Sequence, residues 1–325
     1  MVVITINNTF MKIISIIKKY GIVGTLRKFL QRFLGIEKQQ EAIDSLYYYL
    51  NNYLITASEL PPTNDADLRI MQKCDAELLR ILDNICKKYN LTYWLDFGTL
   101  LGAYRHKGFI PWDDDMDVSM IREDYNKLIP ILKSELRDDD FDIEESNGRI
   151  GFGYKHQQTG IWCDIFPVDC YKVNEYSESN INILKSKISK YRFFYNKKKD
   201  KLSYEVMQEK RLEIINDEPT SKSVIIYHGR EFNHLHPNAF YKKDDIFPLS
   251  KINFEKMEFP APAKVEIYLS KIFGKKFMNV PRCGILHHSI GRTPLSTWAK
   301  QNNINMNMML NNLQNIYPKS NITNL

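Results

Sequence analysis

The sequence lacks the features that mark several large classes of protein. Its five cysteines are odd in number and include no Cys-x-x-Cys pair, and its histidines form no cluster at zinc-site spacing. No apolar run approaches the roughly 20 residues of a membrane-spanning helix. Lysines interrupt the apolar stretch near the N-terminus, where a signal peptide needs continuity. We therefore expect free thiols, no spanning segment and a cytoplasmic location.

The chain also lacks an excess of positive charge over most of its length. The net charge is +6, but residues 1–40 hold seven Lys and Arg against one acid, Glu37. The remaining 285 residues hold 38 of each sign and balance to zero. A nucleic-acid-binding protein is expected to spread its basic residues over the folded body. The distribution therefore argues against nucleic acid as the main partner.

What is present is enough apolar material for a sizeable core. The chain has 325 residues, of which 43% are hydrophobic and 12% aromatic. This length and composition suit one large or two small globular domains, and they exclude disordered and collagen-like classes.

The basic N-terminal segment, residues 1–40, has two interpretations. Apolar residues recur near helical spacing between residues 11 and 34, with six basic residues and no acid among them. Such a segment is typical of a helix that lies on an anionic membrane surface. An ordinary helix that packs on its own domain fits equally well.

The rest of the chain divides into five predicted regions. Paired prolines at 61–62 indicate a linker, and Asp65 is a candidate cap for an amphipathic helix that follows it. Strand-like and helical stretches then alternate, which predicts an α+β fold, a mixed sheet flanked by helices. The regions are 41–65 (helix and linker), 66–175 (the main α+β core), 176–239 (mostly helical, with a solvated loop at the lysines of 197–201), 240–300 (a second folded piece) and 301–325 (a loosely ordered, Asn-rich tail).

Two acids in the predicted core point to metal chemistry. Asp115 and Asp117 alternate with Met116 and Val118, so a strand places both carboxylates on one face. Adjacent carboxylates repel each other unless a cation neutralises them. Hard oxygen ligands at this spacing suit Mg²⁺ or Mn²⁺ with coordination positions left for phosphate oxygens. An EF-hand is disfavoured because Val118 stands where the calcium loop needs glycine.

Five further residues complete the predicted site. Gly98 and Thr99 lie between a predicted strand and a helix, where backbone N–H groups bind phosphate. Asp164, flanked by apolar residues, is a candidate third carboxylate or general base. Asp113 belongs to the same acidic run. Arg105 either binds a phosphate through its guanidinium or lies at the end of a helix without contacting the site.

At these residues the chain resembles a known family. The run GTLLGAYRHKGFIPWDDDMDVSM (98–120), followed by CDIFPVD (163–169), is similar to the LicD family of phosphotransferases, which is related to fukutin and fukutin-related protein. Residues 245–274 show a weaker likeness to the distal segment of the family. Ser119 departs from the pattern, in which glycine is more frequent.

The resemblance implies a nucleotidyltransferase-like fold that transfers a phospho-alcohol, commonly phosphocholine from CDP-choline, to a cell-surface glycan. It also implies metal ligation by Asp115, Asp117 and Asp164, and phosphate binding at Gly98 and Thr99. Two alternatives remain open: a metal-dependent glycosyltransferase that uses a sugar nucleotide, and a catalytically inactive membrane-associated scaffold. If the transferred head group is choline, the candidates to enclose its quaternary ammonium through cation–π contacts are Trp94, Trp112, Tyr154 and Trp162. Core packing is the more ordinary role for each of them.

Overall fold

A computed structural model describes residues 35, 39–45, 65–137, 139–146, 148–154, 159–198, 201–215, 224–229, 239–279 and 295–317. The chain divides into two compact units, Met1–Ala57 and Ser58–Leu325. In the first unit, residues 39–45 are helical. The predicted membrane-surface segment and most of the predicted linker fall outside the described residues.

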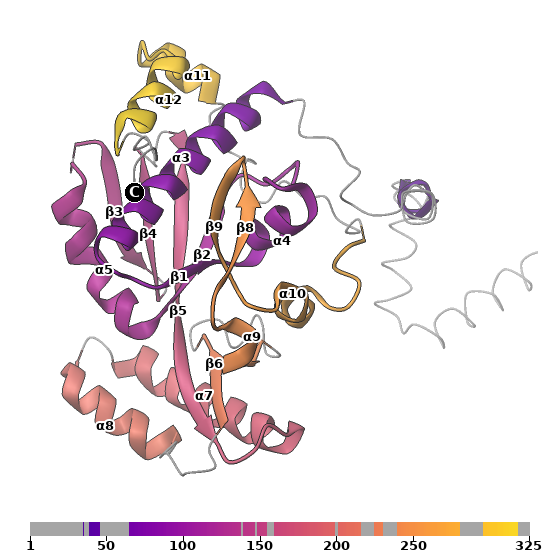
Figure 1. The fold of residues 1–325 in the computed structure, drawn as a ribbon, viewed down its shortest axis with the longest axis vertical. Coiled ribbons are helices and arrows are strands. Elements are labelled where there is room, and N and C mark those ends of the chain that lie inside the picture. Colours follow the sequence, from indigo (N-terminus) through magenta and orange to yellow (C-terminus); the bar gives the residue numbers. More distant parts are fainter. Residues whose placement is uncertain are drawn as a thin grey trace, which may run out of the picture. The chain divides into compact units, whose positions relative to one another are not determined.

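A mixed sheet in the second unit confirms the predicted fold class (Figure 1). Its strands follow the order β1-β2-β5-β4-β3, while β6 pairs with the end of β5 and β7 pairs with β6. The pair β2–β5 is parallel and the other pairs are antiparallel. The strands are β1 (Tyr93–Leu95), β2 (Met116–Ile121), β3 (Phe141–Ser146), β4 (Arg149–Tyr154), β5 (Trp162–Val173), β6 (Val224–His228) and β7 (Tyr241–Lys242).

Helices flank this sheet, and α3 runs across it in Figure 1. Asp65 caps α3 as predicted, because its carboxylate accepts the N–H groups of Asp67 and Leu68. None of the described helices is long and apolar enough to cross a lipid bilayer. The helices are α3 (Ala66–Lys88), α4 (Phe97–His106), α5 (Arg122–Glu135), α7 (Glu178–Lys198), α8 (Tyr204–Ile215), α9 (Lys243–Ile246), α10 (Val265–Phe273), α11 (Leu295–Gln301) and α12 (Met306–Asn315).

The alternating sequence of β2 positions the predicted acids. Met116 and Val118 are fully buried in the main core, together with the apolar face of α3. Because successive side chains of a strand point to opposite faces, Asp117 projects from the other face of the sheet. Burial of the apolar residues therefore fixes the direction of the carboxylate.

A smaller apolar cluster lies beyond the main core, where α7 and α8 pack beside the end of β5 and β6. Leu184, Ile188 and Tyr191 form the buried face of α7. In the region predicted to be mostly helical, residues 176–239, the structure has the helices α7 and α8 but also the strand β6. The predicted loop at the lysine run begins too early, because Lys197 and Lys198 still belong to the last turn of α7. Cationic side chains are favourable there, since a helix C-terminus carries partial negative charge.

The distal segment adds a hairpin, β8 (Ser250–Phe254) and β9 (Met257–Ala261), followed by α10. Phe254 and Phe259 of the hairpin join the main core. Tyr268 of α10 stacks on Tyr241 with ring centroids 4.0 Å apart. The segment therefore packs directly against the part of the fold that contains the acids.

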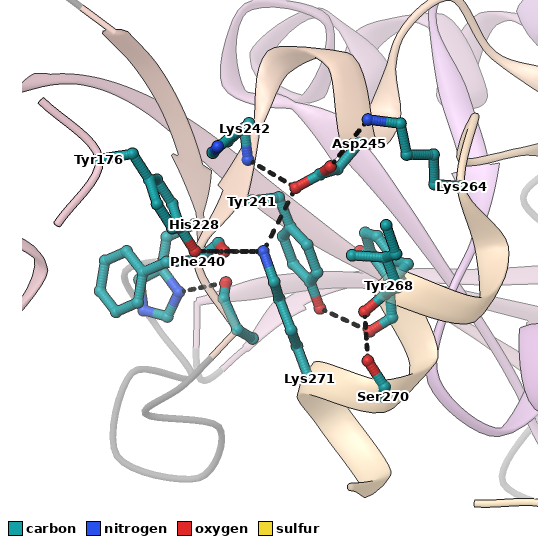
Figure 2. A network of polar contacts seen from close by, with 12 residues as sticks. Tyr176, His228, Phe240, Tyr241, Lys242, Asp245, Lys264, Tyr268, Ser270 and Lys271 are labelled. Carbon is teal, nitrogen blue, oxygen red and sulfur yellow. Dashed lines mark hydrogen bonds and ion pairs between the residues drawn. The ribbon is translucent and has the colours of Figure 1, made fainter. Parts of the chain in front are cut away.

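Lys271 holds this segment in place through the polar network drawn in Figure 2. Its ammonium group donates to Phe240 O at 2.5 Å and lies 3.3 Å from both the Tyr176 hydroxyl and Asp245 Oδ2. Burial alone raises the pKa of Asp245, but the N–H of Lys242 and the charge of Lys271 outweigh it, and the pKa is lowered. One half-buried ammonium group thus joins α10 to three other parts of the fold.

The C-terminal region corrects one prediction. Residues 301–325 were expected to form a loosely ordered tail, but α12 spans Met306–Asn315 and buries Met309 and Leu313 against the main core. Asn305 caps this helix by accepting the N–H groups of residues 307 and 308. Asparagine favours helix caps as well as loops. The Asn-rich composition therefore did not exclude a docked helix.

Candidate active site

The register of the sheet brings two of the predicted acids side by side. Asp117 of β2 lies opposite Asp164 of β5, and Asp164 lies opposite Gly151 of β4. Neighbouring residues in register point to the same face, so both carboxylates project from one row across the sheet. Burial raises the pKa of Asp117 well above its usual value, and the charges of Asp115 and Asp164 raise it further. A bound cation would relieve this repulsion.

A second group of acids lies just before β2. Asp113, Asp114 and Asp115 each offer a carboxylate oxygen within 4.8 Å of the others. Asp114 is buried and its two neighbours are half-buried. Burial raises the pKa of Asp113 well above its usual value, and the charges of Asp115 and Asp114 add to the effect. Asp115 therefore influences the charge state of both groups, through Asp113 and through Asp117.

The first turn of α4 contacts both groups of acids. The Asp117 backbone N–H donates to Thr99 Oγ1 at 2.8 Å. A Cβ atom added to Gly98 would lie 2.8 Å from Asp113 Oδ2, so a larger residue would push that carboxylate aside. The structure thus brings Gly98 and Thr99 to the acids, at a helix N-terminus whose partial positive charge favours phosphate.

The sequence analysis missed Asp96, which caps α4. Its Oδ1 accepts the Phe97 N–H at 2.7 Å, and its Oδ2 accepts the hydroxyls of Ser119 at 2.5 Å and Tyr268 at 2.9 Å. Burial raises the pKa of Asp96 to about 6, although the hydrogen bonds to its carboxylate act to lower it. An Asp between a buried strand and a Gly-Thr helix start is a capping signal, and it was visible in the sequence.

Ser119, the departure from the family pattern, is therefore part of the Asp96 network. Its hydroxyl is fully buried and donates to the carboxylate that caps α4. A glycine at this position has no side chain with which to make that bond.

Arg149 was also missed, and it lies against Asp164 together with Trp162, which was a candidate only for a choline box. The Trp162 indole N–H donates to Asp164 Oδ1 at 2.7 Å, and Arg149 Nε lies 2.7 Å from the same oxygen. The indole ring covers Gly151, where an added Cβ would meet it at 2.0 Å. The Arg149 contact depends on the order of β4 and β5, so no local sequence signal indicates it, whereas Trp162 lies two residues before Asp164 on the same face of β5.

The structure does not bring Arg105 to the acids. It lies near the C-terminus of α4, about 10 Å along the helix from Gly98, and donates to Asn279 O at 2.9 Å. Burial lowers its pKa to about 10. Of its two predicted roles, the placement favours that of a residue at a helix end.

The four aromatic candidates are spread through the fold. Trp94 is fully buried and donates from its indole N–H to Tyr268 OH at 3.1 Å. Tyr154 is buried and Trp112 partly buried in the main core. Trp162 contacts a predicted site residue, because its indole N–H donates to Asp164.

A cavity of about 620 Å³ lies elsewhere, between the start of α5, the end of β5 and the α7–α8 pair. Its lining includes Ile121 and Val168, about 13 Å along their strands from the row of acids. It contains none of the predicted site residues. We therefore place the candidate site at the carboxylates, where the unusual electrostatics lie.

The donor set fits a hard divalent cation. Carboxylate oxygens are the ligands that Mg²⁺ and Mn²⁺ prefer, and such ions bind through a few carboxylates with positions left for substrate phosphates. The crowded acids of this site have raised pKa values, which a bound cation would lower again.

A mixed sheet with acids on adjacent strands, facing a Gly-Thr helix start, defines a domain of the nucleotidyltransferase type. Comparison with known families agrees: residues 90–264, more than half of the chain, match the family described as "LicD/FKTN/FKRP, nucleotidyltransferase domain". The chain belongs to the LicD family.

Individual relatives match shorter stretches. The Haemophilus influenzae lipopolysaccharide cholinephosphotransferase LicD is 37% identical over 103 residues, which are 32% of this chain and 36% of that protein. The mouse ribitol-5-phosphate transferase FKTN is 36% identical over 72 residues, 22% of this chain and 16% of its own length. The human ribitol 5-phosphate transferase FKRP is 29% identical over 104 residues, 32% and 18% respectively. The matches thus span about a third or less of these relatives.

Proposed function

We propose that this chain is a metal-dependent phosphotransferase that moves a phospho-alcohol from a CDP-activated donor to a hydroxyl group of a glycan and releases CMP. The observation that supports it most is the pairing of Asp117 with Asp164 in one row beside the first turn of α4. Relatives in the family are named for the transfer of phosphocholine or ribitol phosphate, and these names support the same class of reaction for this chain.

Each residue of the site has a distinct part in this proposal. Asp115 and Asp117, with Asp164 and Asp113 beside them, would hold Mg²⁺ or Mn²⁺, which neutralises charge on the donor's diphosphate when bound. Gly98 and Thr99 present the N-terminal end of α4 to the phosphates. Little covalent chemistry is required of the protein, because phosphoryl transfer depends mainly on positioning and electrostatics.

The acceptor hydroxyl attacks the phosphorus that bears the alcohol. A new P–O bond to the glycan forms as the P–O bond to CMP breaks, and the hydroxyl proton passes to a carboxylate. Asp164 Oδ2 suits this role, because the indole N–H of Trp162 holds Oδ1 and no bond engages Oδ2 within the described residues. The fixed Oδ1 orients the group.

Phosphocholine is the transferred group that we favour, on the name of the Haemophilus influenzae relative, and its lipopolysaccharide acceptor suggests a lipid-linked glycan. Such acceptors are presented at a membrane surface, and the basic segment at residues 1–40 suits peripheral contact there. Deletion of residues 1–35 should then abolish salt-sensitive binding to anionic vesicles. Vesicle binding that survives the deletion argues against this role.

A panel of activated donors tests the proposed reaction. CDP-choline, CDP-ethanolamine, CDP-glycerol and CDP-ribitol are incubated with Mn²⁺ and glycan extract, beside UDP- and GDP-sugars. We expect CMP release from one CDP-alcohol, and a loss of several orders of magnitude in Asp117→Asn. Release of UDP or GDP instead of CMP identifies a glycosyltransferase. Binding of Mn²⁺ and CDP without turnover of any donor identifies an inactive scaffold.

A further inference from the structure

Arg149 stands at the predicted site without a role in the chemistry above. It begins β4, two residues before Gly151, and therefore shares the face of the sheet that carries Asp164. Its side chain is 34% exposed, whereas that of Asp164 is 14% exposed. The guanidinium of Arg149 thus lies beside the row of acids and is still partly exposed to solvent.

The contact between Arg149 and Asp164 is a close ion pair with poor hydrogen-bond alignment. Nε lies 2.7 Å from Oδ1, yet the buried Nε–H has no hydrogen-bond acceptor. The indole N–H of Trp162 already donates to that oxygen at 2.7 Å. An arginine that settles into its best geometry with a carboxylate makes two parallel N–H···O bonds. Arg122 and Asp169 do so here, at 2.9 and 2.8 Å.

We propose that Arg149 is a donor-binding residue that pairs with Asp164 only until a divalent cation and a diphosphate enter the site. This inference rests on the proposed function. Arg149 and the cation compete for the charge of Asp164, because each neutralises the same carboxylate. Once the cation binds, the guanidinium turns its N–H groups to the phosphate oxygens, whose geometry matches its planar fork. Arg149 therefore makes cation binding and nucleotide binding depend on each other.

The proposal predicts effects of opposite sign in one variant. In Arg149→Gln, Asp164 loses the guanidinium that competes with the metal ion, so Mn²⁺ alone should bind about fivefold more tightly. The same variant lacks the phosphate-binding fork, so CDP at saturating Mn²⁺ should bind at least about tenfold more weakly. A residue that only stabilises the fold cannot produce this result, because damage to the site weakens both ligands together.

Two further variants complete the experiment. Arg149→Lys keeps the charge but not the fork, so Mn²⁺ affinity should stay near that of the wild type while CDP affinity falls to an intermediate value. Arg122→Gln, the matched control, removes an Arg–Asp pair away from the acids and should change neither affinity. Titration calorimetry measures CDP, electron paramagnetic resonance measures free Mn²⁺, and thermal unfolding checks each fold.

Each outcome has one meaning. Tighter Mn²⁺ with weaker CDP in Arg149→Gln supports the proposal, whereas parallel changes or no change contradict it. If Arg149→Gln does not fold, CDP affinity of Arg149→Lys equal to that of the wild type contradicts it instead. A wild-type protein that binds neither Mn²⁺ nor CDP refutes the proposed function itself, and this inference with it.

Discussion

Arg80 gives the sharpest prediction about the fold, because its buried guanidinium caps the C-terminal end of helix α12. Arg80 is 6% exposed and donates to the carbonyl oxygens of residues 313, 314 and 316 at 3.1, 3.2 and 2.9 Å, and also to Tyr317 O. Its Nε lies 2.5 Å from Glu77 Oε2. The last carbonyl groups of a helix have no partner within it, so Arg80 supplies the missing donors.

The size of the effect follows from what the substitution Arg80→Gln leaves behind. Glu77, which is 8% exposed, loses its cation, and several carbonyl groups lose their donors. Removal of one partner from a buried ion pair costs about 3–5 kcal/mol. The helix end lies near the surface and regains some water contact, so we take about 3 kcal/mol. This corresponds to roughly a hundredfold change in a local opening equilibrium.

Native-state hydrogen exchange measures this directly. We expect the amides around Met309 and Leu313 to exchange about 100-fold faster in Arg80→Gln, while the amides of β2 change far less, because α12 opens as a local unit. The control is Arg137→Gln, since Arg137 is 80% exposed and lies 3.9 Å from its acidic partner. A change below about threefold in α12 would refute the reasoning, since it means that apolar contacts alone dock the helix.

Three further predictions concern stability. Gly102→Ala should cost about 3 kcal/mol in chemical denaturation, because its Cβ would lie 2.5 Å from Gly108 O, a backbone atom that cannot move aside. Lys271→Met should cost about 1–3 kcal/mol, and Lys264→Met distinctly less, since Lys264 is 48% exposed. In metal-free protein, the raised pKa of Asp96, about 6, means that the protonated form is favoured on folding. The unfolding free energy should therefore decrease as the pH rises from about 4 to about 6, and this decrease should be smaller in Asp96→Asn.

The local part of the site was predictable from the sequence. Alternation of Asp115 and Asp117 with buried residues requires only the period of a strand, and β2 forms as expected, although it begins at Met116 and leaves Asp115 just before it. Asp65 and the helix that it caps follow from the same kind of local signal. Gly98 and Thr99 lie in the first turn of α4, at the acids. These features depend on neighbours within a few residues.

The long-range part was not predictable, because strand order and register are set by packing across the whole domain. Asp164 was a candidate through its flanking residues, but its place beside Asp117 depends on the parallel pairing of β2 and β5. Arg149 reaches Asp164 only because β4 lies on the other side of β5. Helix α12 was missed for the same reason, since its capping donor, Arg80, lies more than 200 residues away in the chain.

The central claim is that Asp115 and Asp117 grip a divalent ion that holds the diphosphate of a CDP-linked donor. Anomalous diffraction at the manganese edge, from crystals soaked with Mn²⁺ and CDP, tests it most directly. The account predicts a peak about 2.1 Å from a carboxylate oxygen of each residue, with CDP phosphate oxygens completing the coordination. A manganese peak elsewhere, or clear CDP density with no metal at these two side chains, contradicts it.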